Sequence, residues 1–383
     1  MNYKLIEDLN VVQIILMRSW HELDDLIVSA NNNRIDIALI SEPPIHNGRL
    51  IKKRCFKIVQ NVDANIDAPN KVAVLLFNPS VTIVKYRMIH ANVIAFDLNI
   101  NNRNVTIVSL YAAPLIDLDD MLHTLQTLID ASIGDIIIGG DFNARHTKWG
   151  DRLNNTRGTT LLEYCNKNDL IILNKGDKPT YETTRMGRYI SSHIDLTLCT
   201  RGIINEISEW CVADDICVNS DHNAISFKIR AVEYKNRKLM RLYNTKNADW
   251  TKFKAEFSSR INQSQIKQHL TPNISDEALE NEVHKIVLVA QQTSDATLRK
   301  RTSTQKNKIH WLTAELMQLR TECHRMKRRL RRTKSNHYAA ILNSYLELKN
   351  AYHTNVKQAK LNSWKLYCER QYKDTVWNTL YKI

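Results

Sequence analysis

Apolar runs separated by short polar turns dominate the first 230 residues of the chain. Runs typical of β-strands occupy residues 10–19, 35–40, 72–77, 81–84, 93–98, 105–111, 136–138, 170–174, 191–198 and 224–229. Apolar positions at helical spacing predict helices over residues 21–31, 118–129 and 159–167. Because strand runs alternate with helices, the pattern favours a layered α/β domain, with a mostly antiparallel meander between residues 72 and 111.

The pattern changes after residue 230. Residues 231–300 are mixed and polar, with a short helix expected around Trp250–Phe257, and we interpret this segment as a linker. Apolar positions spaced by four and three residues from Trp311 to Leu330 predict a helix that packs on another. A second helix is expected from Tyr338 to Tyr367. We therefore expect an antiparallel helical hairpin within residues 301–383.

Charge divides the chain at the same place. Residues 231–383 hold 30 Lys and Arg against 13 Asp and Glu, whereas residues 1–230 hold 24 against 27. Such a basic segment favours a polyanionic partner, with DNA as the main candidate and RNA as a further one. Candidate phosphate contacts on the first helix are Arg325, Lys327, Arg328, Arg329, Arg331 and Arg332. The alternatives are a solvated charged face, or a hairpin that only docks on a neighbour.

Composition excludes several classes of protein. Hydrophobic residues make up 43% of the 383 residues, enough for a sizeable core. No run approaches the roughly 20 apolar residues of a membrane span, and no secretory signal is present. The seven cysteines show no CxxC or zinc-type spacing. We expect an intracellular protein with reduced thiols that does not bind a membrane.

Polar residues follow the strand runs where loops begin. Glu42 follows the run 35–40, Tyr111 ends the run 105–111, and Asp141 and Asn143 follow a glycine pair after residues 136–138. In open α/β sheets, ligands bind outside the carboxyl ends of strands. Each residue alone also fits an ordinary turn or surface position. Their recurrence at equivalent positions favours a shared site.

Three further polar residues extend this set. Asp195 lies on the opposite face of its alternating run from Ile194, and Asp221 and His222 precede the last strand run. Clustered carboxylates repel one another unless a hard cation neutralises them, and oxygen ligands favour Mg²⁺ or Mn²⁺ over zinc. With an imidazole added, the set suits phosphodiester hydrolysis. Phosphate esters of lipids or nucleotides fit the same chemistry.

Five motifs occur in an order that resembles the endonuclease/exonuclease/phosphatase superfamily. They are Glu42, Ser109–Tyr111, Gly140–Asn143, Ser192–Asp195 and Ser220–His222. The longer stretches around them resemble the apurinic-type endonuclease domain of non-LTR (LINE-type) retrotransposons, whose polyprotein joins this domain to a reverse transcriptase. The resemblance implies a four-layer α/β sandwich, two mixed sheets flanked by helices, over residues 1–230. The basic, mostly helical segment then follows.

The resemblance also covers parts of the basic segment. Residues 360–364 and Trp377–Ile383 resemble the region that joins the endonuclease to the polymerase in these elements. No polymerase motif is present. We therefore expect a gene product that stops before the reverse transcriptase.

The resemblance implies a role for each site residue. Glu42 would bind the divalent metal, and Asp221 would complete the metal site or support the leaving group. Asp141 would position or activate the attacking water, and Asn143 would contact the scissile phosphate. Tyr111 would donate to a phosphate oxygen or help the nucleophile.

The remaining roles concern the imidazole. His222 would contact the phosphate in the transition state, held by Asp195 through a hydrogen bond that raises its pKa. Ser192 would contact these residues rather than the substrate. One position departs from the family, which usually has an asparagine on the first strand where this chain has Ile15. Isoleucine cannot donate a hydrogen bond to a carboxylate or water, so we expect weaker Mg²⁺ binding. Because the other site residues remain, we expect nicking to be reduced rather than absent.

The resemblance therefore implies a Mg²⁺-dependent DNA endonuclease of a retrotransposon. It would nick one strand and leave a 3′-hydroxyl for target-primed reverse transcription. Such a protein would work in the nucleus after import from the cytoplasm and would not be secreted. The alternatives are an abasic-site endonuclease or phosphatase of the same superfamily, and a catalytically weakened relic that binds nucleic acid through its basic segment.

Overall fold

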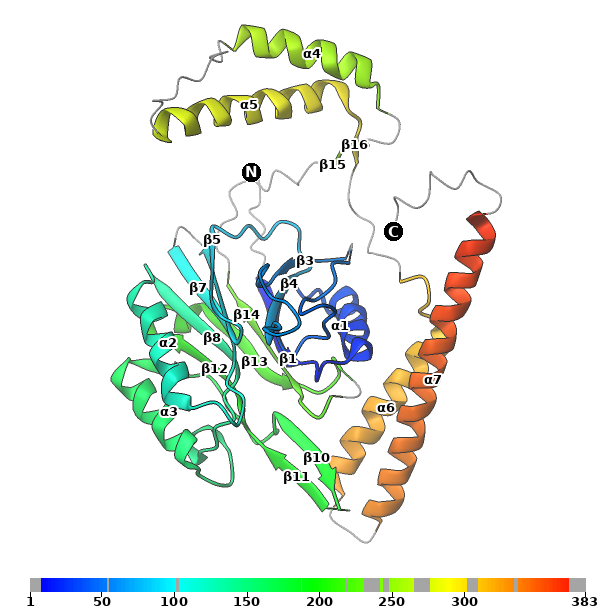
Figure 1. Cartoon of the computed structure of the whole chain (residues 1–383). Coiled ribbons are helices and arrows are strands. Elements are labelled where there is room, and N and C mark those ends of the chain that lie inside the picture. Colours follow the sequence, from blue (N-terminus) through cyan, green and yellow to red (C-terminus); the bar gives the residue numbers. More distant parts are fainter. Residues whose placement is uncertain are drawn as a thin grey trace, which may run out of the picture. The chain divides into compact units, whose positions relative to one another are not determined.

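The computed structural model divides into two compact units (Figure 1). One unit comprises residues 1–235 together with 307–383, and the other comprises residues 236–306. The structure describes residues 8–53, 55–100, 103–186, 188–217, 220–230, 242–243, 248–264, 276–301, 309–333 and 337–371. The predicted α/β domain and the C-terminal helices therefore belong to the same unit.

Two mixed sheets of six strands form the centre of the first unit (Figure 1). The first sheet has the order β13 (Ile207–Ala213), β14 (Ala224–Ile229), β1 (Leu9–Ile15), β2 (Ile37–Ser41), β4 (Val72–Leu76), β3 (Lys57–Val59). The second has the order β5 (Lys85–His90), β6 (Val93–Ile100), β7 (Arg103–Tyr111), β8 (Asp135–Asp141), β12 (Asp195–Thr200), β9 (Leu170–Ile172). One inner pair of each sheet is parallel, β1 with β2 and β7 with β8.

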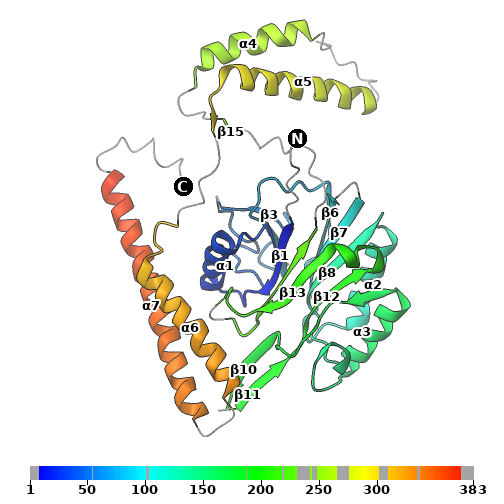
Figure 2. The ribbon, with the colours of Figure 1, turned by 180° about the vertical axis from the view of Figure 1, so that it is seen from behind.

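Helices cover the outer face of each sheet (Figures 1 and 2). Helix α1 (Trp20–Asn33) packs on the first sheet, and helices α2 (Leu118–Asp130) and α3 (Thr156–Lys167) pack on the second. Each begins at a capping side chain, Ser19, Asp117 or Asn155, that accepts a backbone N–H of the first turn. The predicted four-layer sandwich is confirmed. Two 3₁₀ turns lie in connections, Thr147–Trp149 between β8 and α3 and Arg201–Glu206 between β12 and β13.

The glycine pair of β8 allows two close approaches, one within its own sheet and one to the other sheet. A Cβ atom on Gly140 would lie 1.9 Å from the Leu110 carbonyl oxygen of β7. A Cβ atom on Gly139 would lie 2.5 Å from Oε1 of Gln13, which reaches across from β1. Gln13 accepts a bond from the Thr197 hydroxyl (3.0 Å) and donates to a backbone carbonyl of β12 (3.1 Å). Gly139 therefore leaves room for Gln13 of the other sheet with its polar groups bonded, and Gly140 lets β8 lie close to β7 within its own sheet.

Helices α6 (Ala314–Arg332) and α7 (Tyr338–Gln371) form the expected hairpin. An apolar seam joins them, with buried Leu316 and Cys323 against Tyr352 and Val356. The pair lies beside α1 and a two-stranded ribbon, β10 (Tyr181–Arg185) with β11 (Arg188–Ser192) (Figure 2). The helices of the basic segment are thus packed on the α/β domain.

The structure differs from the sequence prediction in several places. The segment interpreted as a linker holds β15 (Leu242–Tyr243), α4 (Trp250–Gln263), α5 (Asp276–Thr297) and β16 (Lys300–Arg301). Residues 81–84 form no strand. The strand begins directly after them, as β5 (Lys85–His90). The single strand expected over residues 191–198 is broken after Ser192 and resumes at Asp195. Trp377–Ile383 lies outside the described residues. Within those residues, none of the helices has the length and hydropathy needed to cross a bilayer.

Candidate active site

A cleft of about 380 Å³ opens where the parallel strands of both sheets end. Its lining comprises Ile15, Glu42, Tyr111, Pro114, Asp141, Asn143, Arg145, Asn155, Tyr181, Arg185, Ser192, Ile194 and His222. The first sheet contributes residues that end β1 or follow β2, and the second contributes residues that end or follow β7 and β8. The predicted convergence of polar residues at strand ends is thus present in the fold.

Asp141 and Asn143 form one side of the cleft. Asp141 ends β8, directly opposite Asp195 in the register with β12. The Asn143 backbone N–H donates to Oδ1 of Asp141 (2.7 Å), and its amide Nδ2 donates to Oδ2 (2.9 Å). Asn143 adopts a left-handed backbone conformation, φ 48°, which asparagine tolerates better than most residues. Burial and then the charge of Asp195 raise the pKa of Asp141 to about 8.

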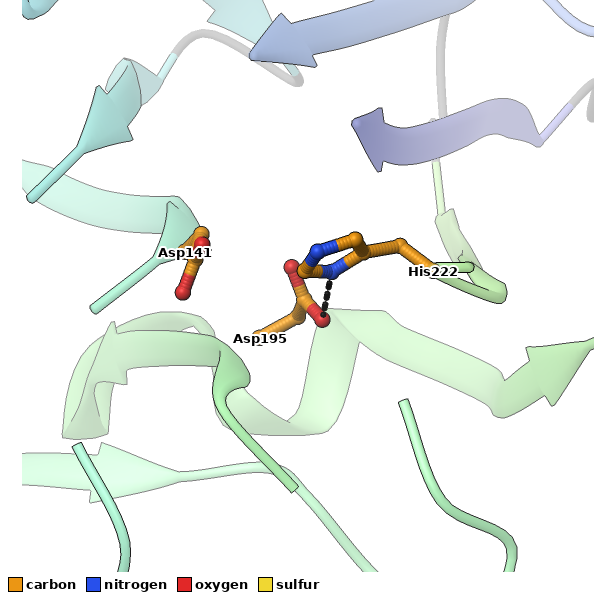
Figure 3. Close-up of side chains that lie close together, drawn as sticks. All are labelled: Asp141, Asp195 and His222. Carbon is orange, nitrogen blue, oxygen red and sulfur yellow. Dashed lines mark hydrogen bonds and ion pairs between the residues drawn. The ribbon is translucent and has the colours of Figure 1, made fainter. Parts of the chain in front are cut away.

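Asp195 and His222 form a buried pair opposite Asp141 (Figure 3). Nδ1 of His222 lies 2.9 Å from Oδ2 of Asp195, as the resemblance implies. Burial disfavours the imidazolium, but the Asp195 carboxylate outweighs it, so the pKa of His222 is raised above its usual value. Because Nδ1 is engaged, Nε2 is the ring nitrogen left for a substrate. The Tyr181 ring packs against the imidazole, with 4.8 Å between ring centroids.

Glu42 and Tyr111 face the cleft from the ends of β2 and β7. The Tyr111 hydroxyl donates to Oε1 of Glu42 (3.1 Å), and Arg18 approaches the same oxygen at 3.7 Å. Burial and the Glu42 carboxylate raise the pKa of Tyr111, so the phenol remains a proton donor. Glu42 has φ 46°, a strained conformation for a glutamate. Such strain at a strand end is typical of a residue whose position matters for a site.

The donor set fits a hard divalent cation. Ligand atoms of Asp141, Asp195 and His222 all lie within 4.8 Å of one another, and Glu42 lines the same cleft. Burial first and the Asp195 charge second raise the pKa of Asp141, and a bound cation would offset both effects by favouring the ionised carboxylate. The carboxylate oxygens of Asp141 and Glu42 suit Mg²⁺ or Mn²⁺, whereas Asp195 is engaged with His222. Asp221 is not among the described residues that line the cleft, and its charge acts on His222 instead.

Two other predicted positions gain detail. Ser192 was expected to support the site residues without facing the substrate, and in the structure it lines the cleft itself. Ile15 also lines the cleft and is only 2% exposed, so its side chain presents methyl groups where the family usually has an amide.

The six basic residues predicted to contact phosphates have different surroundings on α6. Arg325, Arg329 and Arg332 are exposed, as expected of phosphate contacts. Lys327 and Arg331 instead turn toward the α/β domain and bind Glu182. Arg328, with 42% of its side chain exposed, lies 3.9 Å from Asp214. Lys327 and Arg331 were predicted to contact phosphates. In the structure both are instead paired with carboxylates of the same chain.

Sequence reasoning missed several residues that line the cleft. Arg145 follows the Asp141 motif and forms an ion pair with Asp151 (2.9 Å), which in turn accepts the His193 backbone N–H. Arg185 and Tyr181 come from β10 of the two-stranded ribbon, and no apolar run in the sequence predicts this strand. Only Arg145 could have been suspected from the sequence, because it lies two residues after Asn143 in the same loop. An arginine there adds positive charge to a cleft rich in carboxylates.

Comparison with known proteins agrees with this geometry. Residues 105–226 match a family described as endonuclease-reverse transcriptase. The endonuclease domain of TRAS1, a telomere-specific non-LTR retrotransposon, has 29% sequence identity and a TM-score of 0.53. That similarity covers 59% of this chain and 100% of the TRAS1 domain.

Two curated relatives are retrotransposon proteins. A putative 115 kDa protein in the type-1 retrotransposable element R1DM of Drosophila melanogaster is 28% identical over 67% of this chain and 26% of its own length. The Pol polyprotein of the type-1 element R1 from Bradysia coprophila is 23% identical over 65% of this chain and 25% of its own length. The chain thus spans about a quarter of these relatives. The part of the chain that carries the cleft thus has the endonuclease/exonuclease/phosphatase fold and is similar in sequence to endonuclease domains of non-LTR retrotransposons.

Proposed function

We propose that this protein is a Mg²⁺-dependent DNA endonuclease that nicks one strand and leaves a 3′-hydroxyl. The observation that carries the proposal is the convergence of Asp141, Asp195–His222 and Glu42–Tyr111 on one cleft, from both sheets. The similarity to a retrotransposon endonuclease domain supports DNA as the substrate. The 3′-hydroxyl would prime reverse transcription in the nucleus of the host cell.

Asp141 accepts a proton from the attacking water. A base for this step needs a pKa above that of a free aspartate, and burial beside Asp195 supplies it. Asn143 holds both Asp141 oxygens and fixes the direction of the carboxylate. The water oxygen then bonds to phosphorus as the bond to the 3′ oxygen breaks. That oxygen leaves as an alkoxide and takes a proton from solvent.

His222 and Tyr111 meet the charge that develops on the phosphate oxygens. His222 uses Nδ1 for Asp195, so its Nε2–H donates to the phosphate as an imidazolium. Tyr111 stays protonated beside Glu42. Its one hydroxyl proton, which Glu42 accepts in the free protein, would turn to a phosphate oxygen when Glu42 binds the cation. A Mg²⁺ ion held by Glu42, with Asp141 beside it, would polarise the phosphate and stabilise the leaving oxygen. Each of these donors acts most strongly in the transition state.

Nicking of supercoiled plasmid DNA tests the proposal. Asp141→Ala and His222→Ala should each lower the rate by roughly 10²–10⁴-fold because each removes a proton-transfer or charge-stabilising group. Asp169→Ala is the matched control, since Asp169 pairs with Arg201 on the exposed surface. Absence of nicking with either Mg²⁺ or Mn²⁺, or unchanged nicking by Asp141→Ala, would overturn the proposal.

The same assay separates the related activities. Abasic DNA, intact DNA and a small phosphate ester should be compared at equal enzyme concentration. Cleavage restricted to abasic DNA would identify a repair-type endonuclease, and hydrolysis of the small ester alone would identify a phosphatase. Binding of DNA without any cleavage would identify the non-catalytic relic.

A further inference from the structure

Helix α6 presents cations to the loop that carries His222. Arg320, Lys327 and Arg331 are spaced by seven and four residues, so they share one face of the helix. The side-chain amino group of Lys327 donates to the Ser220 carbonyl (3.0 Å), and the Arg331 guanidinium binds both Glu182 and Asp214. Lys327 is only 7% exposed. This face is therefore committed to the α/β domain.

Ser220 connects Lys327 to His222. The Ser220 hydroxyl accepts the His222 backbone N–H (3.1 Å) and donates to the Ile15 carbonyl at the end of β1 (2.8 Å). Lys327 holds the carbonyl of the same serine from the other side. The backbone that begins the His222 loop is thus fixed between β1 and α6.

Glu182 connects Arg331 to both chain neighbours of His222. Its backbone N–H donates to the Asp221 carbonyl (2.8 Å), and its Oε1 accepts the Asn223 amide (3.1 Å). Its preceding residue, Tyr181, packs on the His222 ring. Arg331 and Lys327 compensate the buried Glu182 charge and hold the pKa of this carboxyl below its usual range despite burial.

Docking alone does not account for these residues. Burying cations costs desolvation free energy, and apolar side chains of similar volume could hold two helices together without that cost. The α6–α7 seam does use apolar side chains. Cations occur where α6 meets the loop and ribbon around His222, and there they satisfy specific carbonyl and carboxylate oxygens.

We propose that Lys327 and Arg331 are positioning residues that fix the His222 loop and the β10–β11 ribbon, so that the helices after the α/β domain support the active site. The inference rests on the proposed nuclease function for its kinetic consequence. Its structural consequence is independent of that function, because the contacts constrain the backbone whether or not DNA is cleaved.

The kinetic test uses the full chain with single substitutions. Lys327→Met and Arg331→Met should each lower kcat for plasmid nicking at least tenfold, with KM within twofold of wild type. Lys360→Met is the matched control, because Lys360 anchors α7 to Asp24 of α1, away from the His222 loop. The control should retain the wild-type kcat. Wild-type kcat in Lys327→Met and Arg331→Met, or an equal loss in Lys360→Met, would overturn the proposal.

Hydrogen exchange provides the second readout. In Lys327→Met, exchange should rise in peptides covering residues 214–223 and 180–192 while both six-stranded sheets remain protected. Exchange that rises evenly over the whole domain, or not at all, would overturn the proposal. A wild-type chain that cleaves no DNA would refute the nuclease function, and the exchange measurement would still decide whether Lys327 holds the loop.

Discussion

At the scale of single residues, the carboxylate of Asp195 sets the chemistry of His222. The aspartate starts β12 opposite Asp141, and its oxygen fixes Nδ1 of the imidazole. The same charge raises the pKa of Asp141 and, against burial, that of His222. One carboxylate thereby favours an imidazolium donor and a basic aspartate in a single cleft.

Replacing Asp195 should therefore impair catalysis more than binding. Asp195→Asn keeps the volume but removes the charge that holds the imidazolium, and we expect kcat to fall roughly 10²–10⁴-fold. Steady-state nicking kinetics measure the effect. Asp135→Asn, at the opposite end of β8, is the control. Unchanged kcat in Asp195→Asn would contradict the assigned role.

Replacing Ile15 should improve the use of Mg²⁺ rather than impair it. An amide at this position could donate to a carboxylate or water in the cleft, which the isoleucine methyl groups cannot. Ile15→Asn should lower the Mg²⁺ concentration needed for half-maximal nicking by roughly tenfold, since polar support of metal ligands has effects of about 10–100-fold. Magnesium titrations of both proteins provide the comparison, and identical curves would remove Ile15 as the limiting residue.

At the scale of elements, α6 separates its cations by face. Arg320, Lys327 and Arg331 bind groups of the α/β domain, whereas Arg325 and Arg329 are exposed. A helical period places both kinds within one short sequence. The buried face makes the contact between α6 and the domain dependent on the charge of its carboxylate partners.

The stability of this contact should depend on acid pH. Burial opposes ionisation, but Arg331 with Lys327 lowers the pKa of Glu182, and Arg331 with Lys178 and Arg328 lowers that of Asp214. Carboxyl groups with lowered folded pKa values contribute stability above their ordinary values of 4.5 and 3.8, and lose it as pH falls through the folded values.

Arg331→Met measures that contribution. We expect a loss of roughly 3 kcal/mol in the free energy of unfolding at pH 7, because two buried carboxylates lose their main partner. The difference from wild type should shrink as pH falls below 4. Denaturant titrations at several pH values give both quantities, and a difference independent of pH would argue against the ion pairs as its source.

At the scale of the whole molecule, charge distribution favours contact with a polyanion outside the cleft. The excess of basic residues lies after residue 230, and the exposed cations of α6 belong to the same compact unit as the cleft. Phosphate contacts of this kind are independent of base sequence and weaken as salt rises.

The exposed arginines should therefore control the salt dependence of DNA binding. Replacing Arg325, Arg329 and Arg332 together by glutamine should reduce the slope of log Kd against log salt by about one for each phosphate that the protein no longer neutralises. Binding to catalytically inactive Asp141→Ala protein avoids cleavage during the measurement. A slope equal to that of the parent protein would show that these arginines do not contact DNA.

Much of the cleft could be predicted from sequence because its residues follow recognisable strand runs. Glu42, Asp141 and His222 all come next to buried strands whose apolar pattern is plain. The β10–β11 ribbon could not be predicted in this way, since its residues are mixed and its position depends on contacts with Asn223 and α6. The partners of Lys327 and Arg331 were equally hidden, because the charge of a lysine does not reveal which distant carboxylate or carbonyl it meets.

The contact between α6 and the His222 loop also has a consequence for the order of synthesis. Lys327 and Arg331 follow His222 by about a hundred residues, so a ribosome moving at about 5–20 residues per second needs several seconds to reach them. During that interval the strands of both sheets have already been made, while the loop still lacks its hold from α6. A nascent chain would thus form its sandwich first and the contacts that fix the His222 loop only after the helices emerge.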